Sequence, residues 1–196
     1  MGDFGDCNSD PQDGDMAKVL VIVASPGWGG LERVFVELAN RLAERCEVSV
    51  IHPGEAEYVS RLSARLKETG TLPKGSRRNP LALLHLYRAI RRLAPDIVHT
   101  HGAKATEMVH WISPFVRTPH IATKHNSRQA RIFSRVRWVT AVSEQVRATI
   151  PNGNGAQVIY NGIDARPVPT AVKPDTFTMV AVGRLDKYKG FDLLIR

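Results

Sequence analysis

The stretch KVLVIVASPGWGGLERVFVELANRL, residues 18–42, decides the fold class of this chain. It begins with the apolar run KVLVIVA, which is typical of a buried strand. A glycine-rich turn follows, and apolar residues then recur at the i, i+3 and i+4 spacing of an amphipathic helix. The stretch therefore predicts a strand, a short loop and a helix, the unit from which parallel sheets are built.

The same alternation continues along the chain. Further strands are expected at residues 46–51, 96–101, 119–125, 137–143 and 156–160. Further helices are expected at residues 55–68, 81–94 and 104–115, in a short polar piece from Ser127, and at 144–150 after a capping Ser143, with a loop at 69–80. The pattern predicts an α/β fold with a mostly parallel, doubly wound sheet over residues 18–164, whose site lies at the carboxyl ends of the strands.

The overall composition is that of an ordinary soluble protein, with 43% apolar and 23% charged residues. No apolar run approaches the ~18 residues of a membrane span. Cys7 and Cys46 lack metal or redox spacing, and without a secretory signal they indicate a reducing cytosol. The net charge of +8 leaves open nucleic acid, an anionic membrane, phosphorylated substrates or a solvated basic face. Nucleic acid is disfavoured, because the three tryptophans do not interleave with a basic patch.

The two ends of the chain differ from its middle. Residues 1–17 are acidic and poor in apolar side chains, so we expect a disordered tail. Residues 165–176 are rich in proline and predict a linker. Residues 177–196 then predict a strand, FTMVAV, a polar turn and the start of a helix, which is the opening of a second domain that the chain does not complete.

The turn SPGWGG carries three glycines just past the first strand. Gly27, Gly29 and Gly30 let a ligand approach the backbone, and the helix that follows offers N–H groups to an anion. A dinucleotide fingerprint would need glycine in place of Glu32, so that motif is absent, as is a P-loop. The alternative is a turn that only permits tight packing of strand against helix.

Polar residues also follow the later strands. His99 and His101 lie two apart, so both point to one face of their strand. They fit a metal pair, a hydrogen bond to a polar ligand, or simple packing, and metal is the least favoured because no acidic residue completes a ligand set. Other polar residues at strand ends are Lys124, His125, Asn126 and Asn161. Together they favour a cleft lining, although Asn161 precedes glycine and also fits a simple turn.

Two cations stand at the end of the chain, where Arg184 follows the expected strand and Lys189 begins the expected helix. A guanidinium, an ammonium and a helix N-terminus together suit a diphosphate. The alternative is an exposed basic turn.

Five segments in order, GGLERVFVELANRL, PDIVHTHG, VTAVSE, VIYNGID and VGRLDKYKG, resemble the retaining glycosyltransferases of the GT-B fold, family 4 (glycosyl transferases group 1). The resemblance covers residues 18–196. It implies a Rossmann-like, acceptor-side domain at 18–164, the linker at 165–176, and a donor domain truncated at Arg196. It also implies transfer of a sugar from a nucleotide-diphosphate sugar to a glycan or glycolipid, as in lipopolysaccharide or cell-envelope synthesis, with retention and without a metal or other cofactor.

The same resemblance implies roles for individual residues. Arg184 and Lys189 would hold the donor diphosphate, Gly29 and Gly30 would face it, and His101 would contact the transferred sugar. From their positions at strand ends, we further expect Asn161 on the donor side and Lys124, His125 and Asn126 on the acceptor side of the cleft. The paired-glutamate motif of the family is missing, so we expect the 196-residue chain by itself to be inactive.

We expect the protein to lie in the cytoplasm, at the inner face of the membrane. The helix at 81–94 sets arginines at 88, 91 and 92 beside leucines, which predicts a surface for anionic lipid; the alternative is a core-packed helix with a solvated basic edge.

Two rival functions remain. One is an epimerase or phosphorylase of the same architecture, and the other is a non-catalytic module that binds an acceptor or a membrane.

Overall fold

The computed structural model of this protein describes residues 16–75, 77–151, 155–163, 175–183, 185 and 190–195. The chain divides into two units, Met1–Gly162 and Ile163–Arg196, which we describe one at a time. The expected acidic tail up to residue 15 and the expected linker over residues 164–174 lie outside the described residues, as do Arg184 and Lys189.

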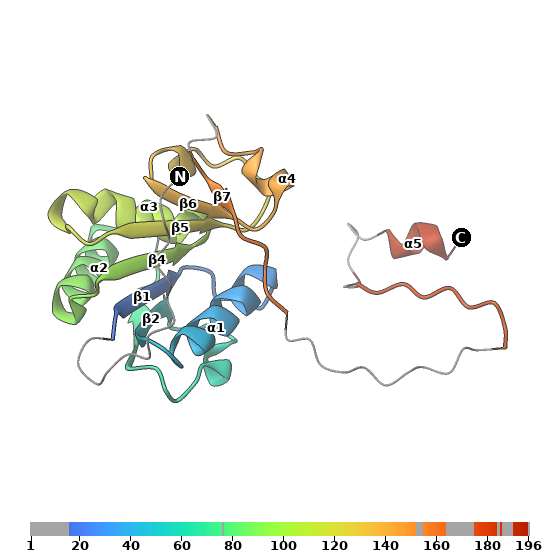
Figure 1. Ribbon diagram of the computed structural model, residues 1–196, viewed down its shortest axis with the longest axis horizontal. Helices are drawn as coiled ribbons and strands as arrows, with labels where there is room; N and C mark the ends of the chain where they lie inside the picture. The colour runs from blue at the N-terminus through green and yellow to red at the C-terminus, as the bar shows by residue number, and fades with distance from the viewer. Residues whose placement is uncertain are drawn as a thin grey trace. The chain divides into compact units, whose positions relative to one another are not determined.

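The first unit is built on one parallel sheet (Figure 1). Its described strands are β1 (Lys18–Val23), β2 (Glu47–Pro53), β3 (Glu68–Leu72), β4 (Ile97–His101), β5 (His120–Lys124), β6 (Trp138–Ala141) and β7 (Gln157–Val158). They are ordered β3-β2-β1-β4-β5-β6-β7, and every neighbouring pair is parallel. The prediction of a doubly wound, Rossmann-like sheet is therefore confirmed. The order reverses between β1 and β4, so the crevice that such sheets use for ligands lies at the carboxyl ends of these two strands.

Five α-helices are described, and two of them begin at a capping side chain. They are α1 (Gly30–Leu42), α2 (Pro80–Leu93), α3 (Gly102–Ile112) and α4 (Glu144–Arg147) in the first unit, and α5 (Phe191–Leu194) in the second. Asn79 caps α2 by accepting a hydrogen bond from the Leu81 N–H at 3.0 Å, with Pro80 at the first helical position. Ser143 caps α4 in the same way at 3.2 Å, as the sequence predicted.

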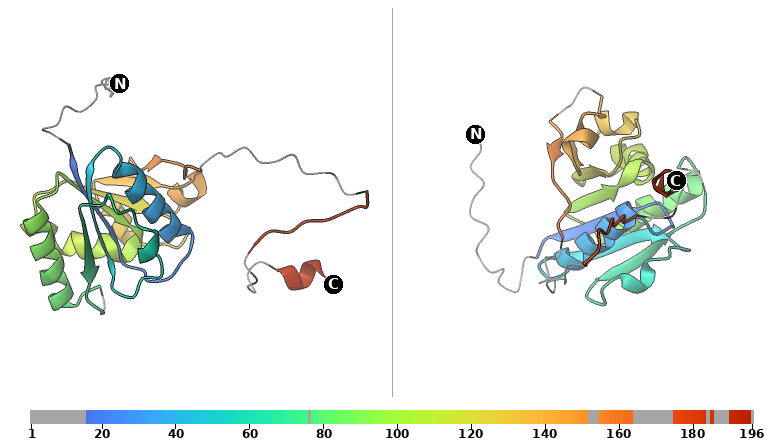
Figure 2. Two further views of the ribbon diagram at one scale, coloured as in Figure 1. Left: turned by 90° about the horizontal axis from the view of Figure 1, so that it is seen from below. Right: turned by 90° about the vertical axis from the view of Figure 1, so that its right-hand side faces the viewer.

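Helices cover both faces of the sheet (Figure 2), and their apolar side chains pack against it. On one face, Phe35 of α1 packs with the β1 valines at 19, 21 and 23. On the other face, Leu86 and Ile90 of α2 and Met108 of α3 pack with Leu20 and Ile22 of β1. Because β1 is covered on both sides, its continuous apolar run belongs at the centre of the sheet. Among the described residues, no helix has the length and apolar character required to span a bilayer.

The helix expected at residues 55–68 is wrong, and so is the loop expected at 69–80. The structure has only a short 3-10 turn, Val59–Arg61, followed by strand β3. Tyr58, Leu62 and Leu66 have helical spacing, but each anchors an irregular segment instead. The Asn40 side chain holds that segment, since its Nδ2 donates to the Arg61 carbonyl at 2.9 Å and its Oδ1 accepts from the Ser63 N–H at 2.8 Å. The signal for β3 was its alternating threonines around a glycine, ETGTL.

The second unit differs from the expectation in one respect. The described residues 175–183 contain no strand, although FTMVAV was predicted to be one. A strand gains its stability from hydrogen bonds to a neighbour, and an apolar run by itself does not supply that neighbour. The helix start expected from GFDLLIR is present as α5, after Gly190 in a left-handed conformation (φ 65°).

Candidate functional site

The loops that follow β1 and β4 meet at the point where the strand order reverses. Gly102, the first residue of α3, has a φ of 79°, and a Cβ added there would lie 2.8 Å from Leu31 Cδ1 in the first turn of α1. Both observations require glycine at this position. The starts of α1 and α3 are therefore packed directly against each other at the carboxyl edge of the sheet.

A network of buried polar groups shapes the glycine turn between β1 and α1. The buried Glu32 carboxylate accepts a hydrogen bond from the Ser25 hydroxyl. The Tyr58 hydroxyl donates to the Ser25 carbonyl at 2.9 Å, and burial together with the nearby Glu32 raises the pKa of Tyr58, which keeps this donor protonated. A Cβ at Gly29 would lie 3.1 Å from Glu32 Oε2. The packing of the protein itself thus accounts for Gly29.

The packing of the described residues does not account for Gly27 and Gly30. A Cβ at either position would meet no atom within 4 Å, and neither residue has the positive φ that favours glycine. Gly30 begins α1, whose first turn has backbone N–H groups that the helix leaves without partners. Close approach of a ligand to this helix start is one requirement that would select glycine there.

The histidines predicted at the ends of β4 and β5 come together in the structure. His101 Nδ1 and His125 Nε2 share a hydrogen bond of 2.9 Å, and their rings stack with centroids 5.1 Å apart. Phe35 of α1 meets the His101 ring edge-on at 5.8 Å, so His101 lies on the side of the sheet that α1 covers. Its Nε2 is buried and has no hydrogen-bond partner in the described structure. A buried nitrogen without a partner is unusual in a folded protein.

The other histidines near β4 are tied to threonines. His99 Nε2 shares a hydrogen bond with Thr123 Oγ1 at 2.7 Å, and His120 Nε2 shares one with Thr100 Oγ1 at 2.8 Å. In the part of the chain that the structure describes, no group of three or more His, Cys, Asp or Glu side chains is arranged to hold a metal ion.

Burial keeps these histidines neutral. Desolvation lowers the pKa of His99 to about 4, and desolvation with a smaller effect of neighbouring histidines lowers the pKa of His120 and His125 to about 4. The pKa of His101 lies well below its ordinary value for the same reasons. Near neutral pH the cluster therefore offers uncharged donors and acceptors of hydrogen bonds.

Lys124 does not line a cleft in this structure, which corrects the expectation from the sequence. Its side chain is buried, and its Nζ donates to the Asn126 carbonyl, to the Arg128 carbonyl at 2.9 Å and to Thr149 Oγ1 at 2.7 Å. All three ammonium donors are thus used to hold the loop after β5. Asn126 is exposed in that loop, where its Oδ1 accepts from the Arg128 N–H, and Asn161 is exposed after β7.

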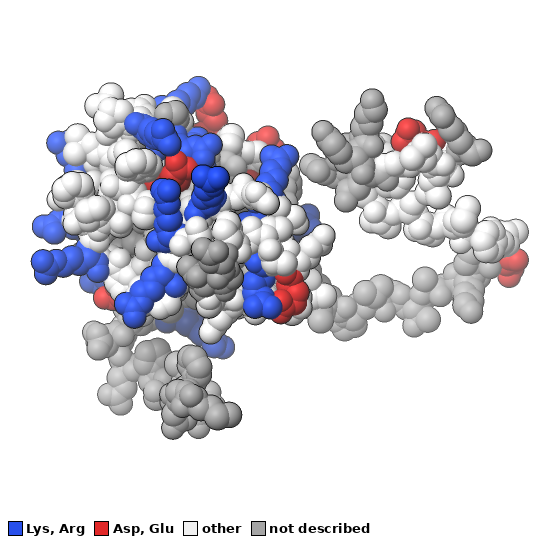
Figure 3. All heavy atoms as spheres, turned by 90° about the horizontal axis from the view of Figure 1, so that it is seen from above, with Lys and Arg blue, Asp and Glu red and all other residues white. Residues whose placement is uncertain are grey.

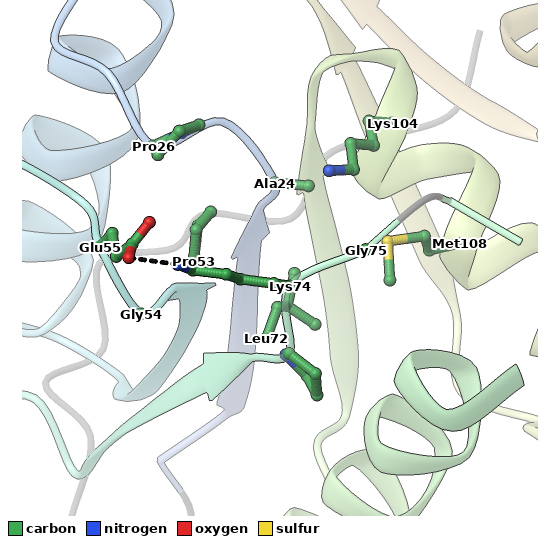
Figure 4. Close-up of a pocket in the computed structure, with 11 residues that line it drawn as sticks. Ala24, Pro26, Pro53, Gly54, Glu55, Leu72, Lys74, Gly75, Lys104 and Met108 are labelled. Carbon is green, nitrogen blue, oxygen red and sulfur yellow. Dashed lines mark ion pairs between the residues drawn. The ribbon is translucent and has the colours of Figure 1, made fainter. Parts of the chain in front are cut away.

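A pocket at the carboxyl ends of β1, β2 and β3 was not predicted from the sequence. It has a volume of about 220 Å³, and its walls are mostly apolar, with Leu72 and Met108 among them (Figure 4). Its charged residues are Glu55, Lys74 and Lys104. They come from two loops and the first turn of α3, so no single segment of the sequence signals the pocket.

Comparison with known proteins places these features in a family. Residues 28–166 match the profile of Glycosyltransferase Family 4. The chain is 25% identical over 179 residues to the lipopolysaccharide core biosynthesis glycosyltransferase LpsD of Rhizobium meliloti (strain 1021), with 86% of this chain and 52% of LpsD covered.

Solved structures share the fold. Anabaena HepE in complex with UDP superposes with a TM-score of 0.62 at 17% identity, over 76% of this chain and 45% of HepE. The lipopolysaccharide outer core galactosyltransferase WaaB superposes with a TM-score of 0.56 at 14% identity, over 81% of this chain and 50% of WaaB. The chain spans about half the length of the relatives that it matches.

Proposed function

This chain belongs to glycosyltransferase family 4, and on that premise we propose that it supplies the acceptor-side half of an enzyme that transfers a sugar from a nucleotide-diphosphate sugar, with retention. The acceptor is a glycan or glycolipid of lipopolysaccharide-core or related cell-envelope synthesis, a proposal supported by the likeness to LpsD. The HepE structure holds UDP, which supports a uridine-diphosphate donor.

Two observations support this proposal, namely the open space at Gly27 and Gly30 and the unpartnered Nε2 of His101. Breaking the bond between a sugar and a diphosphate places negative charge on the leaving phosphate. The free N–H groups at the start of α1 stabilise such charge without a protein nucleophile. In this proposal Arg184 and Lys189 add two fixed cations, so that no metal is required.

The neutral His101 suits contact with the sugar. Its Nδ1 is engaged by His125, so Nε2 is a donor or an acceptor according to which of the two rings carries the shared proton. A sugar hydroxyl complements either state, since it both donates and accepts. A charged imidazolium would instead repel the positive charge that develops on the sugar ring.

The glycine turn provides a test of this assignment. In a two-domain protein, made by joining this chain to a family 4 donor domain, Gly30→Ala should lower sugar transfer roughly tenfold or more, because the methyl group displaces the phosphate from the helix start. The same change should leave the free energy of unfolding unchanged or raise it by up to ~1 kcal/mol. Transfer of radiolabelled sugar and urea unfolding measure the two effects.

Gly29→Ala is the matched control for that experiment. Its Cβ would meet Glu32, so this variant should lose stability as well as transfer. Full transfer by Gly30→Ala would show that the turn serves packing alone.

We also propose that the enzyme works in the cytoplasm at the inner face of an anionic membrane. Leu81 and Leu84 are exposed on α2 beside Arg88 and Arg91, and Trp111 is exposed on the neighbouring α3. On the face drawn in Figure 3, which is seen from above Figure 1, Lys and Arg outnumber Asp and Glu, so the basic character of the molecule extends beyond α2. Apolar and basic side chains side by side are typical of a helix that lies on anionic lipid.

A pair of arginine variants tests the membrane contact. Arg88→Gln combined with Arg91→Gln should weaken co-sedimentation with phosphatidylglycerol vesicles about tenfold or more, at roughly 1 kcal/mol for each arginine near the surface. Arg92→Gln is the control and should have a smaller effect, because Arg92 is already paired with Glu68. Equal binding by the wild type and the double variant would exclude this surface.

A further inference from the structure

The pocket at the carboxyl ends of β1, β2 and β3 offers space for a small ligand. It lies beside the glycine turn, since Ala24 and Pro26 form one wall, and beside the start of α3, since Lys104 and Met108 form another (Figure 4). Its volume of about 220 Å³ is below the ~300–1,000 Å³ of sites for larger ligands. It therefore suits a single sugar residue or a substituent of one.

The charges in this pocket are unbalanced. Lys104 has no ion-pair partner among the described residues, and Figure 4 shows its amine directed into the pocket. The first turn of α3, where Lys104 lies, contains no acidic residue. A lysine in the first turn opposes the helix dipole and so disfavours the helix slightly. An anion at this corner would be attracted by the amine and by the helix start together.

Lys74 can join Lys104 at small cost. Its Nζ lies 2.5 Å from Glu55 Oε1, and both side chains are strongly exposed, at 81% and 71%. Exposed ion pairs contribute little to stability, in the range of ~0–1 kcal/mol. Lys74 can therefore leave Glu55 for a ligand anion in the pocket without a large loss.

We propose that this pocket binds an anionic substituent of the acceptor, a phosphate or a carboxylate on a sugar, through Lys104 and Lys74. The identity of the ligand as acceptor rests on the proposed function, whereas the presence of an anion site does not. Leu72 and Met108 would pack against the apolar face of the sugar ring, and the two ammonium groups would hold its anionic group at the mouth. The pocket would thus select charged acceptors over neutral ones.

The methyl group of Met108 provides a direct reporter, because its side chain is buried and lines the pocket. The full chain, labelled with ¹³C at the methionine methyls, is titrated with glucose, glucose 6-phosphate, glucuronate and inorganic phosphate. We expect both charged sugars to shift the Met108 signal. Glucose should bind with at least tenfold lower affinity, as measured by the concentration needed to shift the same signal. Phosphate alone should act weakly, since it lacks the sugar ring, and the two charged sugars distinguish phosphate from carboxylate.

Lys104→Gln should weaken binding of the charged sugars about tenfold, and Lys104→Glu should weaken it further. Lys18→Gln is the control, because Lys18 begins β1 at the opposite edge of the sheet, and it should bind like the wild type. The side chain at 104 is exposed, so these variants should fold normally. Equal shifts with glucose, unchanged binding by Lys104→Gln, or no shift with any probe would overturn the proposal.

Sugar transfer by the two-domain protein distinguishes this failure from failure of the proposed function. If the two-domain protein transfers sugar but no anion binds near Met108, the proposed glycosyltransferase activity stands and only the proposal of a charged acceptor is wrong. If an anion binds but no nucleotide sugar supports transfer, the anion site stands and the proposed reaction is wrong.

Discussion

Arg184→Ala and Lys189→Ala should each lower sugar transfer by the two-domain protein on the order of 10²-fold or more, because in the proposed site each residue supplies a cation to the leaving diphosphate. Both residues lie outside the described residues, so this prediction rests on the sequence and on the family. The loss should fall mainly on kcat, since negative charge on the phosphate increases as the sugar bond breaks. Initial rates across a range of donor concentrations separate kcat from KM.

Lys187→Ala is the matched control, because it removes the same charge two positions earlier in the sequence than Lys189. It should change transfer much less than Lys189→Ala if position, and not local charge, is what matters. Rates within threefold of the wild type for both Arg184→Ala and Lys189→Ala would contradict the assignment of the diphosphate site.

Acidification from pH 7 to pH 5 should destabilise the first unit strongly. His99, His120 and His125 have a folded-state pKa of about 4, below the ordinary value of 6.5, so the unfolded chain binds more protons than the folded one in this range. Their contribution is therefore fully present above pH 6.5 and is lost as the pH falls toward 4. Each histidine should remove about 2 kcal/mol from the free energy of unfolding over this interval, less where neighbouring histidines couple.

Urea unfolding at pH 7, 6 and 5 measures this loss of stability. These pH values lie above the range in which most carboxylates titrate, so the histidines dominate the change. The experiment is repeated at high salt, because the net charge of +8 also destabilises the fold by repulsion that salt screens. Burial of a neutral imidazole is not screened in this way, so the loss should persist. A free energy of unfolding that stays flat between pH 7 and pH 5 would contradict the buried neutral cluster.

The sequence predicted the sheet well where each strand and its helix carry their own signal. β1 is apolar from Val19 to Val23, α2 has a capping asparagine with proline after it, and both elements formed as expected. The prediction for residues 55–72 was wrong because contacts with distant segments decide the structure of this stretch. Tyr58 is held by Ser25 and Phe35, and the segment after it by Asn40, so its helical spacing did not produce a helix.

The candidate site shows the same division. His101 and His125 were expected to converge because the carboxyl ends of neighbouring parallel strands meet, and the two rings do contact each other. Lys124 also lies at the carboxyl end of a strand, so it was expected in the same cleft. Its side chain instead turns inward and donates to the Arg128 carbonyl, a contact that no local sequence pattern predicts. Lys74 and Lys104 share a pocket only because β1, β2 and β3 end beside α3, which depends on the complete topology.

The central proposal is that this chain provides one half of a glycosyltransferase cleft. The most direct measurement is transfer of radiolabelled sugar from nucleotide-diphosphate sugars to a lipopolysaccharide-core glycolipid, by the 196-residue chain alone and by the two-domain protein. Cooperative urea unfolding first establishes that both are folded. The account predicts little or no transfer by the chain alone, and transfer by the two-domain protein that depends on Gly30 and His101. Robust turnover by the chain alone, or no transfer by the folded two-domain protein with any nucleotide sugar, would contradict it.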